Sequence, residues 1–123
     1  MSVQKSMYEM AQYMNEHLAP KTVVGVFNAG VQGYFSHMTV VNLDGLVNNS
    51  AYEAIQEKRL WTYIQEERIS HISDFDLYLS YKYKSFLDTP DIFKELESVT
   101  RIVAPENARS IPDIALYLVN EKE

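Results

Sequence analysis

The stretch VVGVFNAGVQGYFSHMTVVNLDGLVN, residues 23–48, decides the fold. It contains two short apolar runs, 22–27 and 38–43, and each is followed by a turn sequence with glycine. Nearly continuous apolar, β-branched residues predict strands that are buried on both faces, as in a parallel sheet. The segment 30–37 between them predicts a short amphipathic helix. The stretch therefore predicts a strand–helix–strand unit.

The segment before this unit predicts a longer helix over residues 2–18, with Ser2 as its N-cap. Its apolar residues recur at steps of three and four, which is typical of a one-faced helix. They are Val3, Met7, Met10, Met14 and Leu18. The favoured interpretation is a face buried against the sheet. The alternative is an adaptable partner surface rich in methionine.

The rest of the chain predicts further helices, then strands. Helices are expected at 50–58, 59–68 and 91–96, strands at 69–75, 98–104 and 114–120, and irregular or short-helical structure at 76–87. Two closing strands without a helix between them favour an antiparallel pair. We therefore expect a single α/β domain over residues 1–123, with a three-layer Rossmann-like sheet that is mostly parallel and has an antiparallel C-terminal strand pair.

Composition excludes several classes of function. The net charge of −6 and the lack of a Lys/Arg run argue against nucleic-acid binding. The chain has no cysteine, so it has no disulfide, thiol nucleophile or cysteine-ligated metal. Its three histidines, His17, His37 and His71, lack ligand spacing, so no metal and no cofactor are expected. No apolar run approaches the ~20 residues of a transmembrane helix.

The turn after the first predicted strand is similar in context to the dinucleotide-binding fingerprint G-x-G-x-x-G. Gly30 and Gly33 occupy the second and third glycine positions, and Asn28 replaces the first. Here Gly30 would allow close backbone approach and Gly33 close helix–strand packing. Against a nucleotide site, the helix is short, and Asp44 follows earlier than the ~20 residues expected of the ribose-binding acid. A purely structural glycine turn is the favoured alternative.

Two acidic residues, Asp44 and Asp74, lie at the carboxyl ends of predicted strands, where open α/β sheets collect ligands. A carboxylate pair there could do acid–base work if burial raised one pKa. Asp-Gly is also a preferred turn sequence, which favours a structural role. The candidate ligand-binding corner comprises Asn28, Gly30, Gly33, Asn42, Asp44, Gly45, Asn48 and Asp74.

Several motifs together resemble the C-terminal soluble domain of predicted multi-pass membrane glycosyltransferases, mannosyltransferase-like proteins that use lipid-linked sugar donors. The motifs are N-E-H-L-A-P at 15–20, V-V-G-V-F-N-A-G at 23–30, G-Y-F-S at 33–36 and V-V-N-L-D-G-L-V-N at 40–48. The resemblance covers roughly residues 10–80, and only the last motif is fairly specific.

The resemblance implies that the catalytic acids lie in the membrane portion of a longer protein. This domain would then be a non-catalytic, extracytoplasmic accessory module, anchored through segments outside this sequence. Its partners would be the membrane portion of the same polypeptide and a sugar or lipid-linked substrate. The alternative is a small soluble, cytoplasmic enzyme that binds a nucleotide or S-adenosylmethionine at 28–33. A third hypothesis is an interaction module that uses the methionine stripe or the tyrosine-rich segment 77–86.

Overall fold

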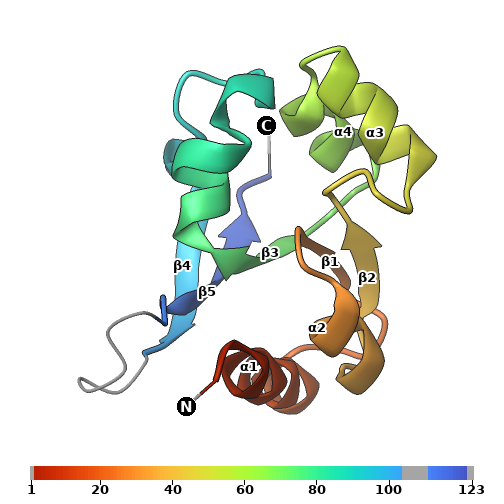
Figure 1. Cartoon of the computed structure of the whole chain (residues 1–123). Helices are drawn as coiled ribbons and strands as arrows, with labels where there is room; N and C mark the ends of the chain where they lie inside the picture. Colours follow the sequence, from red (N-terminus) through yellow and green to blue (C-terminus); the bar gives the residue numbers. More distant parts are fainter. Residues whose placement is uncertain (1, 104–110, 122–123) are drawn as a thin grey trace.

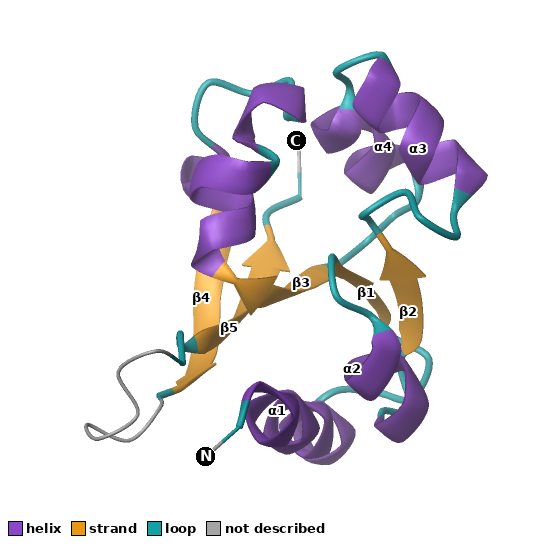
Figure 2. Cartoon of the chain, in the orientation of Figure 1, coloured by secondary structure: helices purple, strands orange, loops and turns teal. Residues whose placement is uncertain are grey.

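A computed structural model describes residues 2–103 and 111–121 of the chain (Figure 1). Helices and strands alternate in its first half, and two strands close the chain (Figure 2). The strands are β1 (Val23–Val26), β2 (Thr39–Asn42), β3 (His71–Phe75), β4 (Leu96–Ile102) and β5 (Ile114–Val119). The α-helices are α1 (Val3–His17), α2 (Gly30–Phe35), α3 (Asn49–Gln56) and α4 (Leu60–Glu66). Three short helical segments follow β3, namely η1 (Tyr78–Lys82), η2 (Lys84–Phe86) and η3 (Ile92–Glu95).

The strands form one five-stranded sheet in the order β2-β1-β3-β5-β4. β1 runs parallel to both of its neighbours, β2 and β3. β5 runs antiparallel to β3 on one side and to β4 on the other. The chain is therefore an α/β protein with a mixed sheet, parallel at one end and antiparallel at the other. The predicted antiparallel pairing of the two C-terminal strands is confirmed, although β4 begins two residues earlier than predicted, and residue 104 lies outside the described residues.

Helix α1 covers part of the sheet with its methionine stripe. Met7, Met10 and Met14 are at most 1% exposed and pack with Val24 and Leu116 of the sheet. The cap matches the prediction as well, since the Ser2 side chain accepts a hydrogen bond from the Lys5 N–H. The stripe is therefore core, and the hypothesis that it forms a partner surface is wrong.

A second apolar cluster involves helices α3 and α4. Leu60, Trp61 and Ile64 of α4 are buried in it together with Ile72 of β3. Adjacent strand residues point to opposite faces, which explains why Ile72 joins this cluster while Phe75 joins the cluster beneath α1. β1 is thus buried on both sides, as its continuous apolarity predicts. The same expectation is wrong for β2, which is only half-buried, and β4 is largely exposed.

The segment after β3 consists of short irregular helices, as predicted. η1 is a single π-helical turn and η2 is a 3₁₀ turn. The ring of Phe27 stacks against Tyr78 at 5.4 Å and against Tyr83 at 4.4 Å between ring centroids. These two tyrosines are half-buried, as expected for rings whose hydroxyls reach water, whereas Tyr81 is exposed. The segment therefore covers the end of β1.

Candidate functional site

The sheet has a topological switch point at β1. The chain passes from β1 to β2 on one side and later returns to β3 on the other side, so the order reverses there. Open α/β sheets bind ligands in the crevice at the carboxyl ends of the strands that flank such a point. In this chain, those ends carry Phe27 and Asn28 after β1 and Asp74 near the end of β3.

The buried side chain of Asp74 occupies this switch point and bonds the backbone N–H groups there. One carboxylate oxygen, Oδ2, accepts hydrogen bonds from the backbone N–H groups of Phe27 at 2.7 Å and Asn28 at 3.0 Å. The other oxygen, Oδ1, accepts from the N–H of Phe75 at 2.8 Å. The residue is only 2% exposed. Successive N–H groups of this kind form an anion-binding nest, and here the anion is the protein's own side chain.

Burial makes this carboxylate unusual. Desolvation raises the pKa of Asp74 to about 6, although the N–H groups of Phe75, Phe27 and Asn28 favour the charged form. The nearby charge of Asp44 raises it further. Burial also raises the pKa of Tyr78, and the charges of Asp74 and Asp44 add to that effect. The structure therefore brings the two predicted acids within electrostatic reach of each other and of the tyrosines above β1.

The two glycines of the fingerprint have no steric role here. A methyl group built on Gly30 would meet no atom within 4 Å, and one on Gly33 would lie 4.0 Å from Val40. The expectation that Gly33 permits close helix–strand packing is therefore wrong, because the space is already sufficient. Close packing is instead required at Gly25, where the methyl would lie 2.8 Å from the buried side chain of Leu43.

Helix α2 is held to the sheet by a residue that sequence reasoning missed. Gln32, fully buried, donates through Nε2 to the carbonyl of Ser73 at 3.1 Å and accepts from the Ser73 hydroxyl. A glutamine inside an otherwise apolar helix face was the available signal. The contact links the turn after β1 to the strand that carries Asp74.

The turn after β2 has its own hydrogen-bond network. Oδ1 of Asn42 accepts from the N–H of Asp44 at 3.1 Å, and Oδ1 of Asp44 accepts from the N–H of Leu46 at 2.9 Å. Asn48 donates to the Asn42 carbonyl and to the Tyr63 hydroxyl. Asn48 also caps α3, since its Oδ1 accepts from the Ala51 N–H. Asp44 thus has the turn role that its Asp-Gly sequence predicts.

The backbone conformation of this turn requires glycine at position 45. Its φ is +81°, a region that side chains with a Cβ rarely adopt, and an added Cβ would lie 3.1 Å from Cα of Tyr52. The eight residues of the predicted corner therefore divide into two groups. Asn28, Gly30 and Gly33 follow β1 near Asp74, and the other four, Asn42, Asp44, Gly45 and Asn48, form the turn after β2.

Three cavities in the described part of the chain lie away from these residues. The first, about 600 Å³, lies between the end of α4 and the end of β5. The others, about 340 and 330 Å³, adjoin η2–η3 and the start of η1. None of these three cavities is lined by Gly30, Asp44 or Asp74, so the open cleft that the nucleotide hypothesis expects at those residues is not among them.

Residues 2–103 and 111–121 contain neither a cluster of metal ligands nor a helix that could cross a membrane. In that part of the chain, no group of three or more His, Cys, Asp or Glu side chains could hold a metal ion. No helix there combines the length and the apolarity that crossing a bilayer requires. Burial lowers the pKa of His71, whose Nδ1 lies 2.8 Å from the Ser70 hydroxyl.

Comparison with known proteins identifies a family but no activity. Neither the curated proteins nor the solved structures include a significant match to this chain. One family model, described as "Domain of unknown function (DUF8728)", matches residues 1–117. Because the match spans nearly the whole sequence, the chain belongs to this family of domains of unknown function.

Proposed function

We propose that this chain is a non-catalytic accessory domain of a membrane glycosyltransferase-like protein. In this role it contacts the acceptor or a partner and does no chemistry itself. One observation carries the non-catalytic part of the proposal, namely the closure of the switch point by Asp74. A phosphate at this point would have to displace a buried carboxylate from the same N–H groups, and its charge would be repelled by that carboxylate.

The membrane context rests on the resemblance of the motif at 40–48 to the soluble domains of such proteins. The partner in this proposal is the membrane portion of the same polypeptide, together with a sugar or lipid-linked substrate. The domain lies on the extracytoplasmic side and needs no cofactor. The net charge of −6 is consistent with the absence of a nucleic-acid partner.

We also infer a Rossmann-like, three-layer arrangement of helices about the sheet. The parallel order β2-β1-β3 supports it, because doubly wound folds reverse direction at their first strand. Two separate apolar clusters support it further: one contains the stripe of α1, and the other contains residues of α3 and α4. A crystal structure that placed all four helices on one face would contradict this inference.

The second candidate is a soluble, cytoplasmic enzyme that binds a nucleotide or S-adenosylmethionine at 28–33. The open space around Gly30 favours it, since a ligand could approach the backbone there. Thermal shift with NAD, S-adenosylmethionine and nucleotide sugars separates the candidates. A ligand at 100 times its Kd should stabilise the fold by about 2.7 kcal/mol. We expect no stabilisation of the wild type, and a clear shift that Gly30→Val abolishes would support the enzyme instead.

The membrane part of the proposal has a separate test in the gene. The native reading frame that contains this domain should also encode several apolar segments of ~20 residues. In the full-length protein, Asp74→Asn should leave glycosyl transfer intact, whereas substitution of acids in the membrane loops should abolish it. A reading frame without such segments would contradict the proposal.

A further inference from the structure

The turn between β2 and α3 presents two aliphatic side chains to solvent. Leu46 is 85% exposed and Val47 is 82% exposed. Leu46 is the most exposed large apolar side chain among the described residues. Single exposed apolar residues are common on protein surfaces, but two adjacent ones at the tip of a turn form a small protruding surface. We refer to Leu46 and Val47 as the apolar tip.

The turn that carries the apolar tip is well braced. The three polar side chains of the turn, those of Asn42, Asp44 and Asn48, all bond to the backbone of the turn or of α3. Gly45 packs closely against Tyr52. The polarity of the turn is thus the reverse of the usual one, because its polar groups are bonded within it and its apolar groups face water. A braced turn of this kind loses little conformational entropy when the tip is buried.

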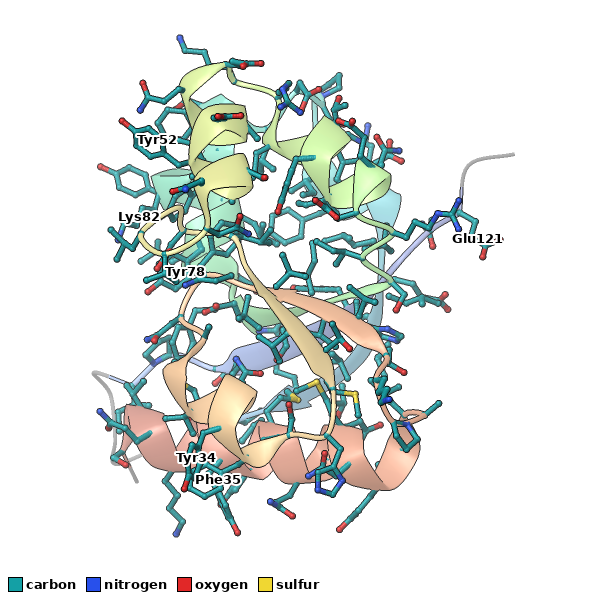
Figure 3. All side chains as sticks on the ribbon, turned by 90° about the vertical axis from the view of Figure 1, so that its right-hand side faces the viewer. Tyr34, Phe35, Tyr52, Tyr78, Lys82 and Glu121 are labelled. Atoms are coloured by element: carbon teal, nitrogen blue, oxygen red, sulfur yellow. The ribbon has the colours of Figure 1, made fainter. Side chains whose placement is uncertain are left out.

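One amphipathic side chain, that of Tyr52, contacts the turn at Gly45, and a second, that of Lys82, lies on the same side of the molecule as Tyr52 (Figure 3). Tyr52 of α3 is 53% exposed, and Lys82 of η1 lies over the ring of Tyr78 at 5.4 Å. Figure 3 shows Tyr52, Lys82 and Tyr78 on the same side of the molecule, whereas Tyr34 lies at the opposite end of that view. Tyrosine and lysine both combine an apolar body with a polar end, the property that favours them at membrane–water interfaces.

We propose that the apolar tip inserts into the interfacial region of an electrically neutral phospholipid bilayer. The small size of the tip favours a bilayer over a protein partner. Stable protein interfaces bury ~800 Å² on each partner, whereas two aliphatic side chains account for only about 200 Å². The net charge of −6 disfavours an anionic bilayer. The inference rests on the proposed function, because a membrane-tethered domain needs only weak insertion to remain at the surface.

Fluorescence labelling tests the insertion directly. The chain has no cysteine, so Val47→Cys and Tyr34→Cys each create a single labelling site for an environment-sensitive dye. Both positions are 82% exposed, which makes Tyr34 a matched control. With phosphatidylcholine vesicles at millimolar lipid, we expect a blue shift and an intensity increase at position 47 and no change at position 34. No change at position 47, or an equal change at both positions, would overturn the proposal.

Vesicle flotation of the unlabelled protein provides the second measurement. The double variant Leu46→Asn/Val47→Asn should lower the partition coefficient on the order of 100-fold, because two aliphatic side chains are no longer buried. Its thermal unfolding should match that of the wild type, since both side chains are exposed in the fold. Binding that needs anionic lipid, or a dimer in sedimentation that the variant disrupts, would overturn the proposal. If the wild type does not bind the vesicles and no ligand raises its unfolding temperature, the insertion alone is refuted. If a ligand raises the unfolding temperature and Gly30→Val abolishes that increase, the proposed function alone is refuted.

Discussion

The turns after β1 and after β2 are similar in sequence but are held in different ways. Each connects a parallel strand to a helix through Asn or Asp and glycine. The turn after β1 is bonded by Asp74, which lies 47 and 46 residues from the N–H groups it binds. In the turn after β2, Asn42, Asp44 and Asn48 bond backbone groups two to six residues away. A turn sequence therefore predicts the hydrogen bonds within the turn, whereas hydrogen bonds from a distant strand depend on the fold.

The largest expected effect comes from removing the Asp74 carboxylate, which bonds the turn after β1 from a distant strand. Asp74→Ala leaves three N–H groups, two of them buried, without their acceptor, and each unsatisfied buried group costs about 1–3 kcal/mol, less what water can restore. We expect urea unfolding to show a loss of about 3 kcal/mol. The matched change in the other turn, Asp44→Ala, removes a single bond to the Leu46 N–H and should cost about 1 kcal/mol or less. Equal losses for the two variants would contradict the comparison.

The pH dependence of stability should also depend on Asp74. Burial raises its pKa from 3.8 to about 6, so the folded state binds this proton more tightly than the unfolded state. The resulting stabilisation is fully present below pH 3.8 and is lost as the pH rises through 6. Its size is up to about 3 kcal/mol.

Unfolding of the wild type and of Asp74→Asn from pH 4 to 8 measures this contribution. Subtraction cancels the other titrating groups, and we expect the wild type to gain stability relative to the variant as the pH falls. A difference that does not change with pH would show that Asp74 titrates normally.

The glycines of the two turns should respond oppositely to substitution. Gly45→Ala should destabilise by about 1–2 kcal/mol, because its positive φ disfavours a side chain. Gly30→Ala should stabilise by about 0.5 kcal/mol, since the site is helical, has free space and restricts the unfolded chain. Thermal unfolding distinguishes the two signs. A loss at both positions would mean that the turn after β1 also needs glycine.

The last prediction concerns the local network of the turn after β2. Asn48→Ala removes the N-cap of α3 and the bond to the Tyr63 hydroxyl, and should cost about 1 kcal/mol. Asn48→Asp keeps the capping oxygen and should recover more than half of that loss. If the Asp variant is no more stable than the Ala variant, the donor bonds of Asn48 matter more than the cap.

Sequence patterns predicted the elements well and the site only in part. The five strands and the helix α1 followed from apolar periodicity, because burial on one or both faces leaves a clear pattern. Asp44 and Gly45 were identified as turn residues because their bonds are local. Gln32 and Gly25 were missed as important, since each depends on a partner far away in the chain.

By itself, the sequence determined the α/β class, the buried face of α1 and the turn after β2, because each leaves a local pattern of apolar or turn-forming residues in the chain. The tertiary structure alone decided that Asp74 bonds the backbone after β1 and that a binding-site layout is closed from within. Parallel strands β1 and β3 lie side by side only after folding, and their pairing brings Asp74 to the N–H groups of Phe27 and Asn28. That pairing joins segments almost fifty residues apart, which no local pattern encodes.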